Sequence, residues 1–462
     1  MRVKAVSLAA ASSLLLLGWM LPLTFAQQPP AEPEPSAQQP SAQPPAQQPG
    51  EVTLELRRGQ RPLMRIAFPP FRGNGQFVGE SGRAARELED TVRRDLEISG
   101  YFDIRGPEQL RALALTGNLQ SDLALYREAG NEVLLLGDVR EEGNRLVFEG
   151  RVLDLGSGQP ILAKRYRGAF SASRRIGHTF ADEVIRFLIG EPGIALSSIA
   201  FTSDRTGHKE IWVMDYDGEN QRRITNHRST SMSPAWGPGG GALAYTSFFN
   251  GPPGVYIADL GSGRKSPVVT SGSLNTSPSF SPDGGRVAFS RSLEGNVEIF
   301  TADRSGGGLR RLTNSAAIDT NPAWSPTGSS IAFTSSRAGN PHLYLMDPEG
   351  SNQRRLTFEG TYNDGASWSP AGDLVAYASR RDGRFQIAVT NVVTLETRVL
   401  TSGPGENESP TFSPDGRKIA YTSRRGGSKQ IYVMDVDGGN VRQLTREGNN
   451  DMADWSRLAA ER

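Results

Sequence analysis

The second half of the chain repeats one pattern six times at a fixed spacing. An apolar segment that begins with Ile199-Ala200-Phe201 recurs every 44 residues. Its later copies begin at Leu243, Val287, Ile331, Val375 and Ile419. A second, aromatic series keeps this step, with a last step of 43: Trp236, Phe280, Trp324, Trp368, Phe412 and Trp455. A β-rich period of this length is typical of four-stranded propeller blades. The sequence therefore predicts a six-bladed β-propeller over residues 197–456, with the aromatic series in structural positions.

Each copy predicts four strands, and the copies are out of phase with the start of the repeat. In the fourth copy the strands are expected at 321–324, 331–335, 343–346 and 353–356. The first copy begins at its second strand, whereas residues 451–456 supply only a first strand. We therefore expect Trp455 to complete the blade that begins at Ile199. This pairing would close the ring and leave no open sheet edge.

The loops that lead into the first strands form the candidate binding surface. Strands in a blade alternate in direction, so these loops gather at one mouth of the central channel. They are polar and include residues 274–277, 319–321, 362–364, 406–408 and 449–451. Because they vary while the strands repeat, we expect them to bind a partner, with Asp319, Asn363 and Asn407 among the contacts. The preceding domain enters at a second strand, so it is expected on the opposite face.

Three kinds of segment precede the propeller. Residues 1–26 combine Arg2 and Lys4 with an apolar run and a small-residue site at Ala26, which predicts a cleaved signal peptide. An uncleaved membrane anchor is the alternative. Residues 27–50 are almost only Pro, Gln, Ala, Glu and Ser, which predicts a disordered linker; a Pro-rich ligand motif is the alternative. Residues 51–192 predict an α/β domain, and residues 457–462 a C-terminal tail.

Alternating strand and helix patterns support the α/β assignment. Residues 52–56, 64–68 and 132–139 read as strands, and 145–154 with 161–170 as a hairpin. One apolar helical face is formed by Ala84, Leu88, Val92 and Leu96. That helix is expected to end at Gly100. A second helix is expected to have Ser173 as its N-cap and Gly190 just after its last turn.

Composition and missing motifs exclude several functions. The net charge of +1 gives no basic excess for nucleic acid, and the absence of cysteine excludes disulfides and thiolate metal sites. The sequence contains no nucleophile elbow, P-loop or dinucleotide fingerprint. The turn aspartates lack the spacing of a calcium loop, so no cofactor or metal is expected. The four histidines are interpreted as surface residues: His178, His208, His227 and His342.

One enzymatic alternative stays open at this point. A secreted propeller enzyme, such as a peptidase, glycosidase or lyase, would place its site at the channel mouth. His227 and Glu408 are the candidate residues for that chemistry.

Two repeated motifs carry a resemblance to a known family. They are Ser-Pro-x-Trp/Phe-Ser-Pro-Asp-Gly and Ile-Tyr-x-Met-Asp-x-Asp-Gly, and His178-x-x-Ala181-Asp182-Glu183 precedes the first blade. The sequence resembles the TolB family of the bacterial Tol–Pal envelope system over nearly everything after Gly50. The resemblance implies a non-enzymatic, monomeric periplasmic adaptor that supports outer-membrane integrity and envelope constriction during cell division.

The resemblance also implies partners and contact residues. The peptidoglycan-associated lipoprotein Pal would bind the channel mouth, and the matching positions here are Leu274, Asn275, Ser277 and Thr320. The inner-membrane protein TolA would bind an N-terminal strand that matches Glu51, Val52, Thr53 and Leu54, a segment suited to β-augmentation. Outer-membrane porins are a further possible partner.

Overall fold

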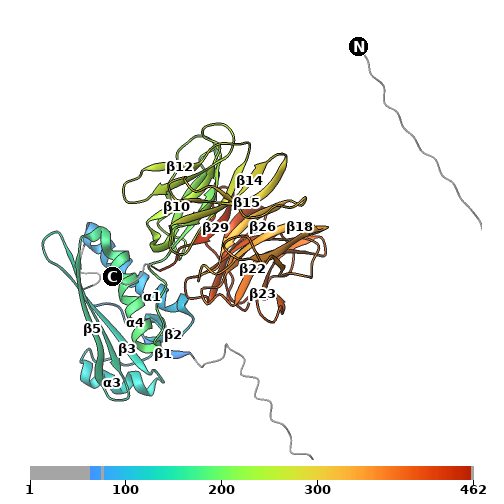
Figure 1. Ribbon diagram of the computed structural model, residues 1–462. Helices are drawn as coiled ribbons and strands as arrows, with labels where there is room; N and C mark the ends of the chain where they lie inside the picture. The colour runs from blue at the N-terminus through green and yellow to red at the C-terminus, as the bar shows by residue number, and fades with distance from the viewer. Residues whose placement is uncertain (1–62, 74–77, 459–462) are drawn as a thin grey trace, which may run out of the picture. The chain divides into compact units, whose positions relative to one another are not determined.

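The computed structural model describes residues 63–73 and 78–458, which fall within one compact unit, Arg61–Arg462. An N-terminal α/β domain is followed by a six-bladed β-propeller (Figure 1), which confirms the predicted fold class. The signal peptide, the linker, the strand predicted at 52–56 and residues 459–462 lie outside the described residues.

The α/β domain is built on a five-stranded mixed sheet in the order β2-β1-β3-β4-β5. Its strands are β1 (Met64–Ala67), β2 (Phe102–Arg105), β3 (Val133–Glu141), β4 (Leu146–Asp154) and β5 (Gln159–Gly168). Strand β1 runs parallel to β2 and β3, whereas β3, β4 and β5 form an antiparallel meander. The short strand β2 has no clear apolar alternation, and the sequence patterns did not predict it.

Helices cover both faces of this sheet. They are α1 (Gly79–Ser99), α2 (Pro107–Leu110), α3 (Leu119–Glu128), η1 (Phe170–Ala172) and α4 (Ser173–Ile189). Helices α1 and α4 lie side by side (Figure 1) and form one core with the sheet, while α2 and α3 pack on its other face. Phe180 of α4 lies so close to β4 that a Cβ at Gly150 would be 2.3 Å from its ring. Only glycine therefore fits at position 150.

The predicted helix ends are confirmed, but one predicted cap is wrong. Gly100 and Gly190 follow α1 and α4 with left-handed φ angles of 73° and 82°, as expected of C-terminal glycines. Ser173 does not cap α4. Its hydroxyl donates to the Glu87 carboxylate of α1, because the preceding 3₁₀ turn already leads the chain into the helix.

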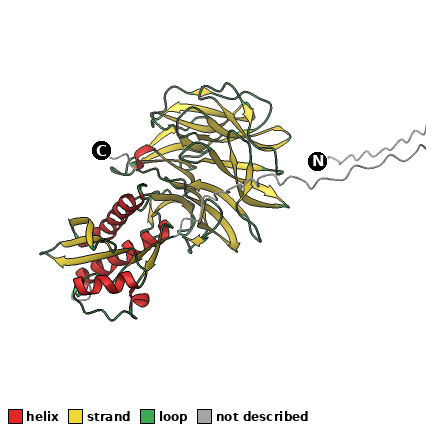
Figure 2. Cartoon of the chain, turned by 90° about the horizontal axis from the view of Figure 1, so that it is seen from below, coloured by secondary structure: helices red, strands yellow, loops and turns green. Residues whose placement is uncertain are grey.

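The propeller consists of six four-stranded antiparallel sheets (Figure 2). The α-helices that the structure describes all lie in the other domain, and the short helical segment of the propeller is a 3₁₀ turn. Blade one is β29 (Asn450–Trp455), β6 (Ser198–Ser203), β7 (Glu210–Asp215) and β8 (Arg222–Arg223). Blade two is β9 (Ser231–Trp236), β10 (Ala242–Ser247), β11 (Gly254–Asp259) and β12 (Lys265–Val269), with the turn η2 (Pro238–Gly240). Blade three is β13 (Asn275–Phe280), β14 (Arg286–Leu293), β15 (Asn296–Asp303) and β16 (Arg310–Arg311).

The other three blades follow the same plan. Blade four is β17 (Asp319–Trp324), β18 (Ile331–Ala338), β19 (Asn340–Met346) and β20 (Arg354–Arg355). Blade five is β21 (Asn363–Trp368), β22 (Leu374–Arg381), β23 (Arg384–Asn391) and β24 (Thr397–Val399). Blade six is β25 (Asn407–Phe412), β26 (Lys418–Gly426), β27 (Ser428–Asp435) and β28 (Arg442–Gln443).

The blades are held together by apolar cores that lie between neighbouring sheets. Ala288 and Ile299 of blade three pack against Trp324 and Phe333 of blade four, and similar clusters join other neighbours. Within the aromatic series, Phe280, Trp324, Phe412 and Trp455 are buried, while Trp236 and Trp368 are partly buried. Both faces of each inner sheet are therefore covered, which suits face-to-face stacking.

The ring closes as the repeat register predicted. Strand β29 pairs antiparallel with β6, with Trp455 opposite Ile199. The indole Nε1 of Trp455 donates to the Ser197 hydroxyl at 2.8 Å, and its backbone N–H donates to Thr411 of blade six at 3.1 Å. The first sheet thus joins the two ends of the propeller.

Removing β29 should abolish this closure. We expect a chain that ends at Asn449 to lose its cooperative thermal transition or to melt at a much lower temperature. The physical reason is that β6 loses its hydrogen-bonding partner and the blade loses a buried tryptophan. Loss of the tryptophan alone lowers the free energy of unfolding by about 3–5 kcal/mol. Circular dichroism melting measures this, with a chain ending at Leu458 as the control. Identical melting curves would contradict the closure.

Candidate functional site

The candidate site is the central channel, which is lined by the first strand of every blade. The channel cavity has a volume of about 1130 Å³. Its walls come from β9, β13, β17, β21, β25 and β29, so six segments far apart in sequence contribute side chains to one space. The site therefore exists only in the closed ring.

Each first strand carries a bulge at its third residue, next to the channel. The left-handed φ angles there are 53° at Ser233, 54° at Ser277, 52° at Asn321, 71° at Gly365, 51° at Ser409 and 55° at Met452. Pairing with the second strand shifts in register around this residue in all six blades. Five of the six residues are not glycine and carry a Cβ in an unfavourable backbone region. Bulges of this kind redirect side chains at functional rims.

Neighbouring blades hold the bulges in place. The backbone N–H of Ser277 donates to the Thr246 hydroxyl of blade two at 3.1 Å. The N–H of Asn321 donates in the same way to Ser290 of blade three at 3.0 Å. These hydrogen bonds cross from one blade to the next, so the strained backbone depends on the stacking of the blades.

The second residue of each first strand divides the mouth into two halves. It is uncharged in blades two to four, at Met232, Thr276 and Thr320, and acidic in blades five, six and one, at Asp364, Glu408 and Asp451. The Asp364 carboxylate accepts from the side chains of Asn321 and Thr334 at 2.7 and 2.6 Å. The mouth is thus neutral on one side and anionic on the other.

Lysines partly neutralise the anionic half. The Lys429 Nζ lies 3.1 Å from a Glu408 oxygen and 3.6 Å from an Asp451 oxygen, and Lys209 lies 3.9 Å from Asp451. Burial raises the pKa of Asp451, whereas the two lysines oppose that rise. Deeper in the channel, burial raises the pKa of Asp454 to about 6. The backbone N–H of Trp236, which donates to this carboxylate at 2.6 Å, opposes the rise.

Four of the residues predicted to bind a partner are buried in the structure. Asn275, Asp319, Asn363 and Asn407 open their strands, with exposed fractions of 0, 0, 0 and 3 %. Their side chains are held by Arg291, Arg337, His342 and Gln386, at 3.1, 2.8, 2.9 and 2.9 Å respectively. They fix the loops that surround the mouth. The proposed contacts that stay partly accessible are Leu274, Ser277 and Thr320.

The interpretation of all four histidines as surface residues is wrong for two of them. His342 is 4 % exposed and contacts Asn363, so it helps to hold a mouth loop from inside. His178 is also 4 % exposed, because the polar face of α4 is covered by the first blade. Helical periodicity alone gives no sign of that second covering surface. His208 is exposed and His227 is partly buried.

An aromatic rim borders the mouth face along blades two to five. Exposed large apolar residues occur in or beside the loops between second and third strands and those before first strands: Phe248, Phe249, Leu293, Ile318, Phe358 and Tyr362. On the opposite face, the large apolar residues exposed in the turns are all aliphatic: Leu309, Val393, Leu395 and Val441. Aromatic residues are enriched in protein interfaces, so the mouth face has the composition of a docking surface.

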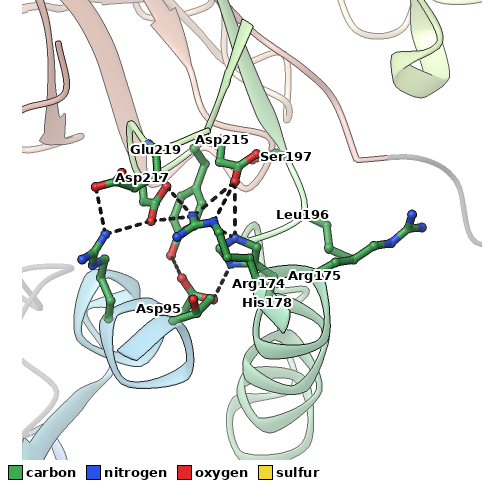
Figure 3. A network of polar contacts seen from close by, with 12 residues as sticks. Asp95, Arg174, Arg175, His178, Leu196, Ser197, Asp215, Asp217 and Glu219 are labelled. Carbon is green, nitrogen blue, oxygen red and sulfur yellow. Dashed lines mark hydrogen bonds and ion pairs between the residues drawn. The ribbon is translucent and has the colours of Figure 1, made fainter. Parts of the chain in front are cut away.

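A buried polar network joins the α/β domain to the first blade, on the face opposite the mouth (Figure 3). Arg174 of α4 contacts Asp215, at the end of β7, and Asp217, in the following turn, at 3.2 and 3.1 Å. His178 Nδ1 lies 2.7 Å from an Asp95 oxygen of α1. The Tyr216 hydroxyl donates to the other oxygen of Asp95 at 2.8 Å. The network therefore spans both main helices and one blade.

The connection between the domains is equally constrained. Asp182 of α4 accepts from the backbone N–H of Ala195 at 3.0 Å, and a Cβ at Gly193 would lie 2.0 Å from its carboxylate. Gly193 thus permits the chain to pass close to the helix. This docking confirms the predicted side of attachment, because the turn at Asp215–Asp217 and the mouth loops leave the blade at opposite ends.

The network shifts two pKa values in the same direction. Burial lowers the pKa of His178, but the neighbouring carboxylates of Asp215 and Asp95 outweigh this and raise it to about 9. Burial raises the pKa of Asp182 to about 7, although the hydrogen bond from the Ala195 backbone opposes this rise. The docked state therefore binds protons more tightly than the unfolded chain.

Within residues 63–73 and 78–458, no group of three histidines or carboxylates is arranged to hold a metal ion. The turn aspartates instead accept local hydrogen bonds; Asp283, for example, accepts from Ser281 and Gly285 at 2.5 and 3.0 Å. No helix in the same stretches is long and apolar enough to cross a membrane.

The fold and the channel together define a class of protein, in which a propeller has an α/β domain on one face and an open channel with an aromatic rim on the other. The chain matches the TolB beta propeller domain over residues 186–459 and the TolB amino-terminal domain over residues 52–161. It therefore belongs to the TolB family. Because TolB is a non-enzymatic Tol–Pal component, the alternative of a propeller enzyme does not apply.

Individual relatives agree with this assignment. A crystal structure of TolB from Acinetobacter baumannii superposes with a TM-score of 0.75 at 29% identity, covering 86% of this chain and 97% of that one. The Tol-Pal system protein TolB of Geobacter metallireducens is 38% identical over 161 residues, which is 35% of this chain and 38% of the relative. The TolB homolog of Chlorobium chlorochromatii is 35% identical over 167 residues, or 36% and 38% of the two chains. These matched segments span less than half of the curated relatives.

The stability of the protein should fall as the pH rises from 7 to 9. The native pKa of His178 is about 9 and its ordinary value is about 6.5, so its contribution is complete below pH 6.5 and is lost as the pH rises through 9. The raised pKa of Asp182 acts in the same sense, and its contribution to stability is lost as the pH rises through about 7. Each proton contributes a slope of at most about 1.4 kcal/mol per pH unit.

Urea unfolding at several pH values measures this slope. His178→Asn should flatten it between pH 7 and 9, whereas the exposed control His208→Asn should leave it unchanged. An NMR titration that places the His178 ring near 6.5 would show that the buried contact does not hold a proton.

Proposed function

We propose that the protein is a periplasmic adaptor whose channel mouth binds the peptidoglycan-associated lipoprotein Pal. The observation that carries this proposal is the mouth itself, which is open, rimmed by aromatic residues and located on the face away from the α/β domain. Membership of the TolB family supports the Tol–Pal context. The rim supplies apolar contact area, and the channel supplies hydrogen-bonding groups that fix orientation.

The two halves of the mouth suggest how such a partner is recognised. The neutral half presents Ser277 and Thr320, which give hydrogen bonds without charge. The anionic half, around Asp364 and Glu408, favours a partner with positively charged or amide side chains on that side. A partner of this polarity would enter in one orientation only.

The second proposed contact is the N-terminal strand. Glu51, Val52, Thr53 and Leu54 would add to a TolA sheet by β-augmentation, which needs only an accessible extended segment. These residues lie outside the described part of the chain, so this proposal rests on the sequence pattern and the family. Export by the signal peptide, the monomeric state, contact with porins and a role in envelope constriction during cell division belong to the same proposal.

Binding of Pal should depend on the rim and the neutral half of the mouth. We expect Phe358→Ala and Thr320→Arg each to weaken binding of the organism's own Pal at least tenfold, which corresponds to about 1.4 kcal/mol. Phe358 is 59% exposed, so its truncation leaves the core intact. Surface plasmon resonance with the full-length mature chain measures the affinity.

The matched control is Val393→Ala, which truncates an apolar side chain that is 84% exposed in a turn on the opposite face. It should bind Pal as the unchanged protein does. Equal affinity for all three variants would place the Pal site elsewhere, and a loss only in Val393→Ala would place it on the α/β side.

A further inference from the structure

A second, smaller pocket lies on the outer part of blade one, away from the channel. Its volume is about 340 Å³. It is bounded by the β6–β7 connection, the start of β7, strand β8 and the loop before β9. The lining residues are Thr206, His208, Glu210, Arg223, Asn226 and Arg228. Two guanidinium groups and an imidazole thus face a space with a single carboxylate.

The propeller repeat shows what a residue at position 223 normally does. The equivalent residues of blades three, four and six are Arg311, Arg355 and Gln443. Each donates a side-chain hydrogen bond to a carbonyl two residues later, at 2.7, 2.6 and 2.7 Å respectively. Arg311 also pairs with Glu298, the equivalent of Glu210, at 2.8 Å. In these blades the side chain is used to tie down its own loop.

In blade one this arrangement is broken. Among the residues that the structure describes, neither a hydrogen bond nor an ion pair engages the side chain of Arg223 or of Arg228. The Glu210 carboxylate is engaged by other groups instead. One oxygen accepts from the backbone N–H groups of His227 and Arg228 at 2.7 and 2.9 Å, and the other accepts from the Thr225 hydroxyl.

Arg228 has a left-handed backbone, with a φ angle of 53°. Its N–H donates to Glu210 Oε1, the oxygen that corresponds to the one Arg311 contacts on Glu298 in blade three. Glu210 is only 1 % exposed, so its charge is turned into the blade and compensated there. The two arginines are left to face the pocket.

We propose that this pocket binds a phosphate- or sulfate-type oxyanion. Arg223 and Arg228 supply planar donors that match the oxygens of such a group, and His208 adds a third nitrogen donor. The Asn226 amide and the Thr206 hydroxyl provide neutral donors at the edge. The volume accommodates an oxyanion with an attached organic group, so the ligand is either a free phosphate compound or the head group of an anionic lipid.

Phosphate-specific stabilisation of the mature protein tests the proposal. We compare melting temperatures in potassium phosphate and potassium chloride at equal ionic strength, with inorganic phosphate as the probe. The unchanged protein should be stabilised by phosphate, and the half-saturating concentration should rise at least fivefold in Arg223→Ala and in Arg228→Ala. Arg355→Ala is the matched control, because it removes an arginine at the same repeat position of blade four.

If phosphate has no specific effect, or if Arg355→Ala loses it as much as Arg223→Ala does, the pocket is not an oxyanion site. Flotation with phosphatidylglycerol vesicles separates the two sources: binding that needs Arg223 indicates a lipid head group, and its absence, together with a positive melting result, indicates a soluble phosphate. Unchanged affinity for Pal in Arg223→Ala would separate this site from the channel mouth.

Discussion

The pairing of β29 with β6 is the contact on which the rest of the structure depends. It joins residues about 250 positions apart, and it sets Trp455 between the last blade and the first. The channel is lined by six first strands, and the last of them exists only as this C-terminal strand. The bulges beside the channel are held by hydrogen bonds from neighbouring blades, so their geometry depends on the same closure.

The polar network at Asp95, Arg174 and His178 has a different role. Buried ion pairs add little net stability because the charges must be taken out of water, but they tolerate few alternative arrangements. Here they attach the helices to one turn of blade one. The α/β domain is thereby kept on the face away from the mouth, and the aromatic rim is left for a partner. The outer pocket of blade one lies on the mouth face as well, but its lining residues are not among those that line the channel.

Much of the fold could be predicted because its signals are local and periodic. Six copies of one spacing predict six blades, and the phase of the copies predicts that Trp455 joins Ile199. Gly100 and Gly190 mark helix ends, because a left-handed residue after a helix favours glycine. The failures have physical causes as well. Strand β2 is too short to show alternation, and the Ser173 hydroxyl contacts Glu87 of a distant helix, which no local pattern reveals.

The sequence by itself determined the architecture, the closure and the side on which the channel opens, since these follow from strand number and direction. Only the tertiary structure decided which loop residues are accessible. Asn275 and Asn363 appear polar and exposed in a linear reading, yet each folds back to hold its loop. His178 and Arg223 show the same limit in two ways. His178 is buried by the first blade, and the Arg223 side chain lines a pocket without the hydrogen bond that its counterparts in blades three, four and six make. The burial and hydrogen bonding of a single side chain depend on which other side chains surround it in the folded protein, and a repeat pattern predicts strand pairing but not these surroundings.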